Sequence, residues 1–149
     1  MITSDPQARA VRIAEVLDLL RRDAAAEDRD LLLAFAPVVF EEMPDRLALG
    51  LSAPAIAARI VDHFRFVARE MPPPTQLYKG LPGIHVRAAN PTEAEALAQG
   101  ARQGLPLETT VVHTHSVDMP FIFDSLKNYY RKAGLRVFSG IHPVFTVRR

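Results

Sequence analysis

The stretch from Thr109 to Arg149 reads TTVVHTHSVDMPFIFDSLKNYYRKAGLRVFSGIHPVFTVRR, and it decides the fold. Its first part, Thr109–His115, alternates β-branched and polar residues, which predicts a strand. A proline-started helix to about Ala133 follows, and Leu135–Val147 alternates again, which predicts a second strand. A strand–helix–strand unit alone leaves sheet edges open. We therefore expect the chain to work as part of something larger, or to associate through its open edge.

The ends of this predicted helix carry recognisable signals. Asp118 lies two residues before Pro120, and a short polar residue with proline near the first helical position is typical of a helix start. Gly134 suits the left-handed position that ends a helix. The final strand has two available pairings: parallel to the strand at Thr109 through a right-handed crossover, or antiparallel to a short strand at Ile84–Ala88. Pro143 must then lie at an edge or a bulge.

The first half of the chain is predicted to be helical. Helical periodicity and caps place helices at residues 7–26, 28–42, 45–49 and about 52–70. Ser4 or Asp5 is expected to cap the first helix, Pro37 to bend or break the second, and Asp45 to cap the short third one. Three consecutive prolines then form a stiff linker. The expected organisation is a helical segment at 1–71, a proline-rich linker at 72–79 and an α/β module at 80–149.

Composition limits the classes of function. The net charge of +1 gives no general attraction to nucleic acid, so no nucleic-acid partner is expected. No apolar run approaches the roughly 20 residues of a membrane span, and no targeting segment is visible. Cysteine is absent, which excludes disulfides and thiolate chemistry. We expect a soluble cytoplasmic protein with no membrane partner.

Several motifs in the chain resemble one family. The strings VDMPFIFDSL, AGL at the helix end and IHPVFTVRR are similar to the N-terminal region of the large bacterial NAD-specific glutamate dehydrogenases. The strings FEEMP and SAPAIAARIVDHFRFVAR and the R-x-x-N-P pattern at Arg87–Pro91 are less specific matches to the same region. The resemblance implies an α+β fold: a bundle-like helical lead-in, followed by the opening β-α-β part of an ACT-like (ferredoxin-like) module with a small sheet.

The resemblance also implies a role. The complete enzymes oxidatively deaminate L-glutamate to 2-oxoglutarate and ammonia, using NAD. The chain has no G-x-G-x-x-G and nothing that resembles the catalytic or dinucleotide-binding domain. We therefore expect a non-catalytic regulatory or assembly segment without a cofactor of its own. Its expected partners are the remainder of the parent enzyme or a second copy bound at the open sheet edge, with an amino acid as a candidate effector.

The candidate effector or interface residues lie around this helix: Asp118, Pro120, Phe121, Asp124, Ser125, His142 and Pro143. For three of these residues, a purely structural role is an alternative to a role in binding. Asp118 suits a helix cap, Asp124 suits the positive helix start, and Ser125 is a small inward-facing hydroxyl. Regulatory ACT domains commonly have glycine directly after the proline. Here Phe121 stands there, as it does in the resembling dehydrogenases, and this disfavours amino-acid binding by the loop.

Two other classes of function compete with the regulatory segment. One is a free-standing ACT-like sensor that binds an amino acid at a dimer interface near Ser116–Phe121. The other is a small metalloenzyme, because His113 and His115 point the same way on a strand and His142 has matching parity. A polar sheet face explains the H-x-H pair more simply, so no metal is expected. A triad of Ser125, His142 and Asp124 lacks a nucleophile elbow, and no catalytic residue is expected.

Overall fold

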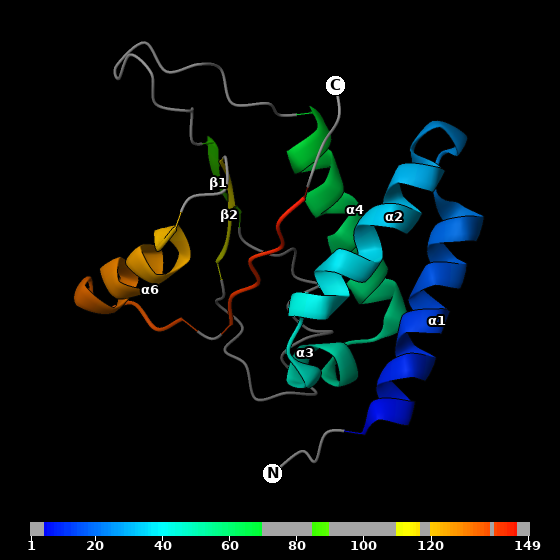
Figure 1. Cartoon of the computed structure of the whole chain (residues 1–149), viewed down its shortest axis with the longest axis horizontal. Helices are drawn as coiled ribbons and strands as arrows, with labels where there is room; N and C mark the ends of the chain where they lie inside the picture. Colours follow the sequence, from blue (N-terminus) through cyan, green and yellow to red (C-terminus); the bar gives the residue numbers. More distant parts are fainter. Residues whose placement is uncertain (1–4, 70–84, 90–109, 117–119, 138, 146–149) are drawn as a thin grey trace.

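The computed structural model describes residues 5–69, 85–89, 110–116, 120–137 and 139–145. Four helices come first, and a two-stranded sheet and one further helix follow (Figure 1). Their bounds are α1 (Pro6–Asp23), α2 (Ala26–Glu42), α3 (Asp45–Gly50), α4 (Ala53–Arg69), β1 (His85–Ala89), β2 (Val111–His115) and α6 (Ile122–Lys132). The fold is α+β with a helical lead-in, as predicted. The predicted linker and the stretch that follows β1 lie outside the described residues.

The helical half holds the main core. Its buried side chains come from all four helices, and the largest fully enclosed ones there are Val16, Leu32, Ile56 and Ile60. Helix α1 begins as predicted, because the Asp5 carboxylate accepts hydrogen bonds from the backbone N–H groups of Gln7 and Ala8 at 3.0 and 3.1 Å. Pro6 occupies the first turn, where no intrahelical donor is lost.

Sequence analysis predicted that Pro37 bends or breaks the second helix. Helix α2 runs through Pro37, so the predicted break does not occur. An internal proline costs roughly 3 kcal/mol. Burial of neighbouring side chains offsets this cost, since Phe35, Ala36 and Val39 are each at most 7% exposed. Pro37 itself is exposed.

Asp45 does not cap α3, which corrects a second expectation. Pro44 holds the cap position without a side-chain hydrogen bond, and Asp45 is the first helical residue. Its carboxylate instead pairs with the guanidinium of Arg9 on α1 at 2.5 Å. The same guanidinium donates to the carbonyls of Phe40 and Met43, which end α2. Arg9 therefore joins three helices and satisfies carbonyls that an isolated helix end would leave unpaired.

Helix α4 packs on two sides. Ile56, Ile60 and Phe64 face the helical core. Phe66 is also fully buried but lies 5.5 Å, ring to ring, from His113 on β2. Helix α4 thus stands between the bundle and the sheet, as Figure 1 shows. It fixes the position of β2 relative to the bundle.

Neither of the two pairings predicted for a C-terminal strand occurs in the observed sheet. Strand β1 pairs with β2 in antiparallel register, from His85 opposite His115 to Ala89 opposite Val111. The described part of the expected last strand, residues 135–137 and 139–145, forms no strand. Phe145 instead stacks on Phe35 of α2, with ring centroids 4.4 Å apart and planes 12° apart. Ile141 and Phe145 of this segment pack against the helical core, which removes part of their apolar surface from water.

Candidate interface and effector site

The start of α6 has an unusual backbone. Phe121 precedes the helix in the left-handed conformation, with φ 66°, and is 78% exposed. It makes no side-chain cap hydrogen bond, although its carbonyl accepts from the N–H of Ser125 at 2.8 Å. The helix begins at Ile122, so Pro120 lies in the preceding turn and not at the first helical position. Asp118, the predicted cap, lies outside the described residues, and the cap position belongs to Phe121.

Phe123 organises the region around the first turn of α6. The His142 ring stacks on it with centroids 5.4 Å apart and planes 19° apart, and Lys127 Nζ lies 4.5 Å from the ring centroid. Lys127 also pairs with Asp124 at 2.8 Å. Gly140 approaches so closely that a Cβ there would lie 2.6 Å from Phe123 Cζ. Two predicted site residues, Asp124 and His142, are therefore brought together through Phe123 and Lys127.

The remaining predicted residues are less closely involved. Ser125 is exposed on the helix surface, so the prediction of an inward-facing hydroxyl is wrong. Pro143 is half-buried beside His142. Phe123 was not among the residues singled out from the sequence. The signal that points to it is the density of aromatic residues on one short helix, which exceeds what a single sheet face can cover.

His113 and His115 share one face of β2, as the strand pattern predicted. Burial alternates along the strand, and the face with both histidines is the more covered one. The His113 ring meets His63 edge to face at 5.3 Å, and its Nε2 lies 3.7 Å from a carboxylate oxygen of Asp62. His142 packs instead on Phe123. Within the described ranges, no three His, Asp or Glu side chains are grouped so that they could hold a metal ion.

Asp62 and His63 were not singled out from the sequence. They lie on α4, and the ring contacts of Phe66 and His63 with His113 mark where this helix meets the sheet. Two adjacent polar residues in the middle of α4 were the available signal. Their partners could not be read from the pattern, because strand β2 lies about fifty residues further along the chain.

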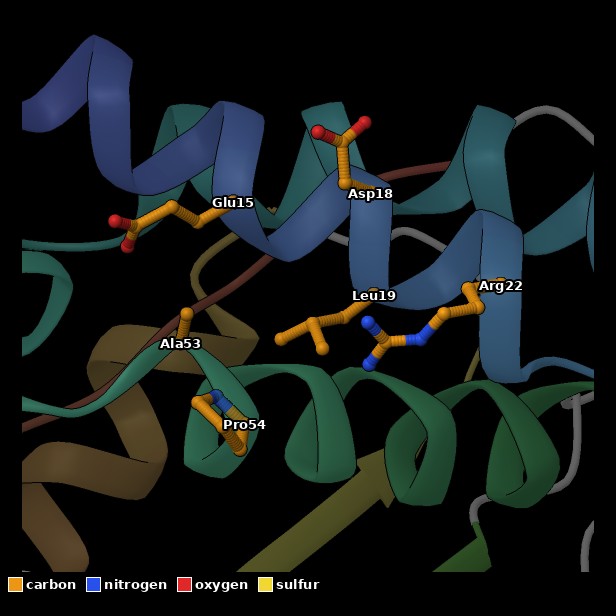
Figure 2. A pocket seen from close by; sticks show the side chains of 6 residues that line it. All are labelled: Glu15, Asp18, Leu19, Arg22, Ala53 and Pro54. Atoms are coloured by element: carbon orange, nitrogen blue, oxygen red, sulfur yellow. The ribbon is translucent and has the colours of Figure 1, made fainter.

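A shallow pocket between α1 and α4 is a different feature. Figure 2 shows Glu15, Asp18, Leu19 and Arg22 on α1 above Ala53 and Pro54 on α4. Arg22 also donates to the neighbouring Asp23 carboxylate at 2.7 Å. That hydrogen bond is the main reason why the pKa of Asp23 lies below its usual value and that of Arg22 above it. The pocket includes no residue of β2 or α6, so it does not belong to the candidate interface.

The folded parts define a class of protein: an α+β chain whose helical lead-in carries a small α/β module with an exposed helix. A family model described as the ACT1 domain of glutamate dehydrogenase matches residues 35–149, which is most of the chain. The chain belongs to this glutamate dehydrogenase ACT1 family. The match begins within α2, so it includes α3 and α4 as well as the sheet and α6.

The other two comparisons are negative. No curated protein and no solved structure matches the chain. Among the described residues, no helix has the length and apolar character needed to cross a bilayer.

Proposed function

We propose that this chain is a non-catalytic regulatory and assembly segment of a bacterial, cytoplasmic, NAD-dependent glutamate dehydrogenase. The complete enzyme would oxidatively deaminate L-glutamate to 2-oxoglutarate and ammonia. The match to the ACT1 family model supports a glutamate dehydrogenase as the parent enzyme. The observation that supports the assembly role is the exposure of α6, in which the described structure buries no residue.

The exposed surface around α6 has the character of an interface. Phe121, Tyr129, Leu135 and Val144 are 78%, 67%, 59% and 52% exposed. Single exposed apolar residues are common on monomers, but a group of them on one part of the surface marks a binding face. Aromatic side chains are also enriched at interface centres. The remainder of the parent enzyme is the partner that this proposal assigns to the face.

The test has two parts, run on the purified chain. With L-glutamate and NAD, we expect no NADH to form, and turnover would overturn the non-catalytic assignment. With the separately purified catalytic portion of a glutamate dehydrogenase from the same organism, we expect co-sedimentation. A Tyr129→Ala variant should weaken that binding, whereas a Val11→Ala variant, which changes an exposed residue on α1, should not.

A free-standing amino-acid sensor is the second candidate, and one observation favours it. Phe121 adopts φ 66°, the backbone conformation that a glycine would take most readily at this turn. The turn that would expose the backbone to a ligand is thus formed despite the bulky residue. Titration calorimetry against the twenty amino acids separates the candidates. Binding by the isolated chain supports the sensor, and no heat with any amino acid removes it.

A further inference from the structure

We propose that the contact between α4 and β2 is a pH-sensitive switch, which is closed at neutral pH and opens when both His63 and His113 are protonated. We call this contact the seam, and its side chains are Asp62, His63 and Phe66 of α4 and His113 and His115 of β2. Helix α6 follows β2 in the chain, so an open seam frees the proposed binding face from its fixed place on the bundle. The inference goes beyond the proposed function, because the switch needs no partner protein.

Histidines are concentrated at the seam. The chain has five histidines, and His63, His113 and His115 make ring contacts across this seam. A fourth, His85, holds the register position on β1 directly opposite His115. Imidazole is the type of side chain that ordinarily changes charge between pH 5 and 8. The contact that joins the sheet to the helical half in Figure 1 therefore contains groups that acidification can charge.

The two central rings are packed against each other and against phenylalanines. The His63 and His113 centroids lie 5.3 Å apart, with the ring planes 81° apart, and both residues are half-buried. His63 also meets Phe35 of α2 at 5.5 Å, and His113 meets Phe66 at the same distance. Partial burial removes some of the water that stabilises a charged imidazole. The closed seam therefore suits neutral rings better than charged ones.

The charges on α4 accommodate one proton and oppose a second. Nε2 of His113 lies 3.7 Å from Oδ2 of Asp62, so a charged His113 has a counter-ion. The Asp62 side chain is 55% exposed, so solvent weakens this attraction. Half-buried Arg59 lies one helical turn before His63, on the same side of α4, and its positive charge disfavours a proton on His63.

The other elements at the seam present aromatic or basic groups. Phe35 is the ring of α2 that contacts His63. On β2, His115 lies two residues from His113 on the same face of the strand. On β1, Arg87 holds the register position opposite His113. These groups supply no counter-ion for a second imidazolium.

One more carboxylate lies nearby, on another side of α4. Asp28 of α2 lines a pocket of about 350 Å³ between α1, α2 and α4, together with Asp62 and Arg65. In that pocket Arg65 supplies a positive charge beside both carboxylates. A second proton at the seam therefore places two cations with ring centres 5.3 Å apart beside a single close carboxylate. The open seam accepts this proton more readily, so acidification favours opening.

Distances between spin labels test the switch on the whole chain without a partner. The chain has no cysteine, so introduced cysteines carry the labels at chosen positions. One pair, Ala68→Cys and Thr114→Cys, spans the seam, and a reference pair, Val11→Cys and Ala58→Cys, joins α1 to α4. All four positions are exposed. We expect double electron–electron resonance to find a longer and broader distance across the seam at about pH 5.5 than at about pH 7.5, with an unchanged reference distance.

Two substitutions should move this response in opposite directions. His63→Gln keeps a polar side chain but cannot take up the second proton, so the ratio of open to closed seam at about pH 5.5 should fall about tenfold. Asp62→Asn removes the counter-ion of the first proton, so opening should begin at a higher pH. The matched control is Asp18→Asn, which neutralises an exposed carboxylate on α1 and should leave the response unchanged.

Circular dichroism at neutral pH checks that each variant folds, and His113→Gln, which also removes one of the two proton acceptors, replaces His63→Gln if that variant unfolds. A seam distance that is the same at both pH values, a change in both label pairs, or a glutamine variant that responds like the wild type would each overturn the switch. Binding to the catalytic portion of the dehydrogenase is measured separately at neutral pH. A chain that binds that portion but shows no opening keeps the proposed function and loses only this inference.

Discussion

At the scale of single residues, Phe121 carries backbone strain. A bulky residue with positive φ is uncommon, because its Cβ crowds the backbone, and the cost is roughly 1–2 kcal/mol. The side chain is mostly exposed, so little packing offsets this cost. The conformation persists because the turn and the helix start on either side determine it. The turn therefore has a backbone conformation that glycine adopts readily, although phenylalanine occupies it.

Replacing Phe121 should reveal this strain. We expect Phe121→Gly to be more stable than Phe121→Ala by about 1 kcal/mol, because both remove the ring and only glycine removes the Cβ clash. Urea unfolding of the two variants measures the difference. An alanine variant as stable as the glycine variant would show that the turn is not strained.

The Arg22–Asp23 pair makes a second prediction at this scale. The hydrogen bond from Arg22 holds the pKa of Asp23 below its usual value of about 3.9. Any stabilisation from the pair is therefore complete above that value and is lost as the pH falls through the lower, folded-state pKa. In Arg22→Gln, NMR titration should find the Asp23 pKa raised toward about 3.9. An unchanged pKa would mean that Arg22 is not its partner.

At the scale of elements, Arg9 compensates for an unfavourable helix end. Helix α2 finishes with Glu41 and Glu42, where the helix dipole disfavours negative charge. The Arg9 guanidinium donates to carbonyls at that end and pairs with Asp45. Hydrogen bonds to charged groups are the stronger ones in proteins. One side chain on α1 therefore ties α2 and α3 together.

Replacing Arg9 should therefore lower the stability of the fold. We expect Arg9→Ala to lower the free energy of unfolding by about 2–3 kcal/mol, since two carbonyls and a carboxylate lose a charged hydrogen-bond donor. The matched control is Arg21→Ala, which breaks an exposed pair with Asp18 on the same helix. That change should cost within about 0.5 kcal/mol. Equal losses in denaturant unfolding would contradict the role given to Arg9.

Sequence patterns predicted elements well where local signals agreed with packing. The Asp5 cap, the helix at about 52–70 and the Gly134 turn, with φ 74°, were all confirmed. The patterns failed where a distant segment decided the outcome. Pro37 is tolerated because the core holds α2. Phe145, near the end of the alternating segment, stacks on that helix, and the described part of the segment forms no strand. Such alternation cannot distinguish a sheet partner from a helical one.

The candidate site shows the same division. The strand pattern predicted that His113 and His115 share a face, and the structure confirms this. It could not predict that His63 and Phe66 of α4 cover that face, or that His142 stacks on Phe123. Those contacts join residues that are distant in sequence. The effector and interface roles of the predicted residues stay predictions.

At the scale of the whole molecule, the segment from Ser139 to Phe145 connects the two halves. Gly140 and His142 contact Phe123 on α6, whereas Ile141 and Phe145 pack on the helical core. Alternate residues thus bind opposite partners, as an extended segment allows. The position of α6 relative to the bundle depends on this segment together with the packing of β2 on α4.

Loosening this segment should release α6 without unfolding the bundle. In Phe145→Ala, we expect faster amide exchange in residues 139–145 and in α6, with the protection of α1 and α4 retained. Hydrogen exchange with mass spectrometry makes the measurement, and Val144→Ala, which changes an exposed neighbour, is the control. Uniform loss of protection across the chain would contradict a connecting role and indicate global destabilisation.

The central claim is that the chain acts by binding the rest of a glutamate dehydrogenase and performs no chemistry itself. Sedimentation velocity of an equimolar mixture of the chain and the catalytic portion of that enzyme tests it most directly. The claim predicts one faster boundary that contains both proteins and that weakens with Tyr129→Ala. Two independent boundaries, at concentrations of about 10–100 µM where interfaces of ordinary affinity are occupied, would contradict it.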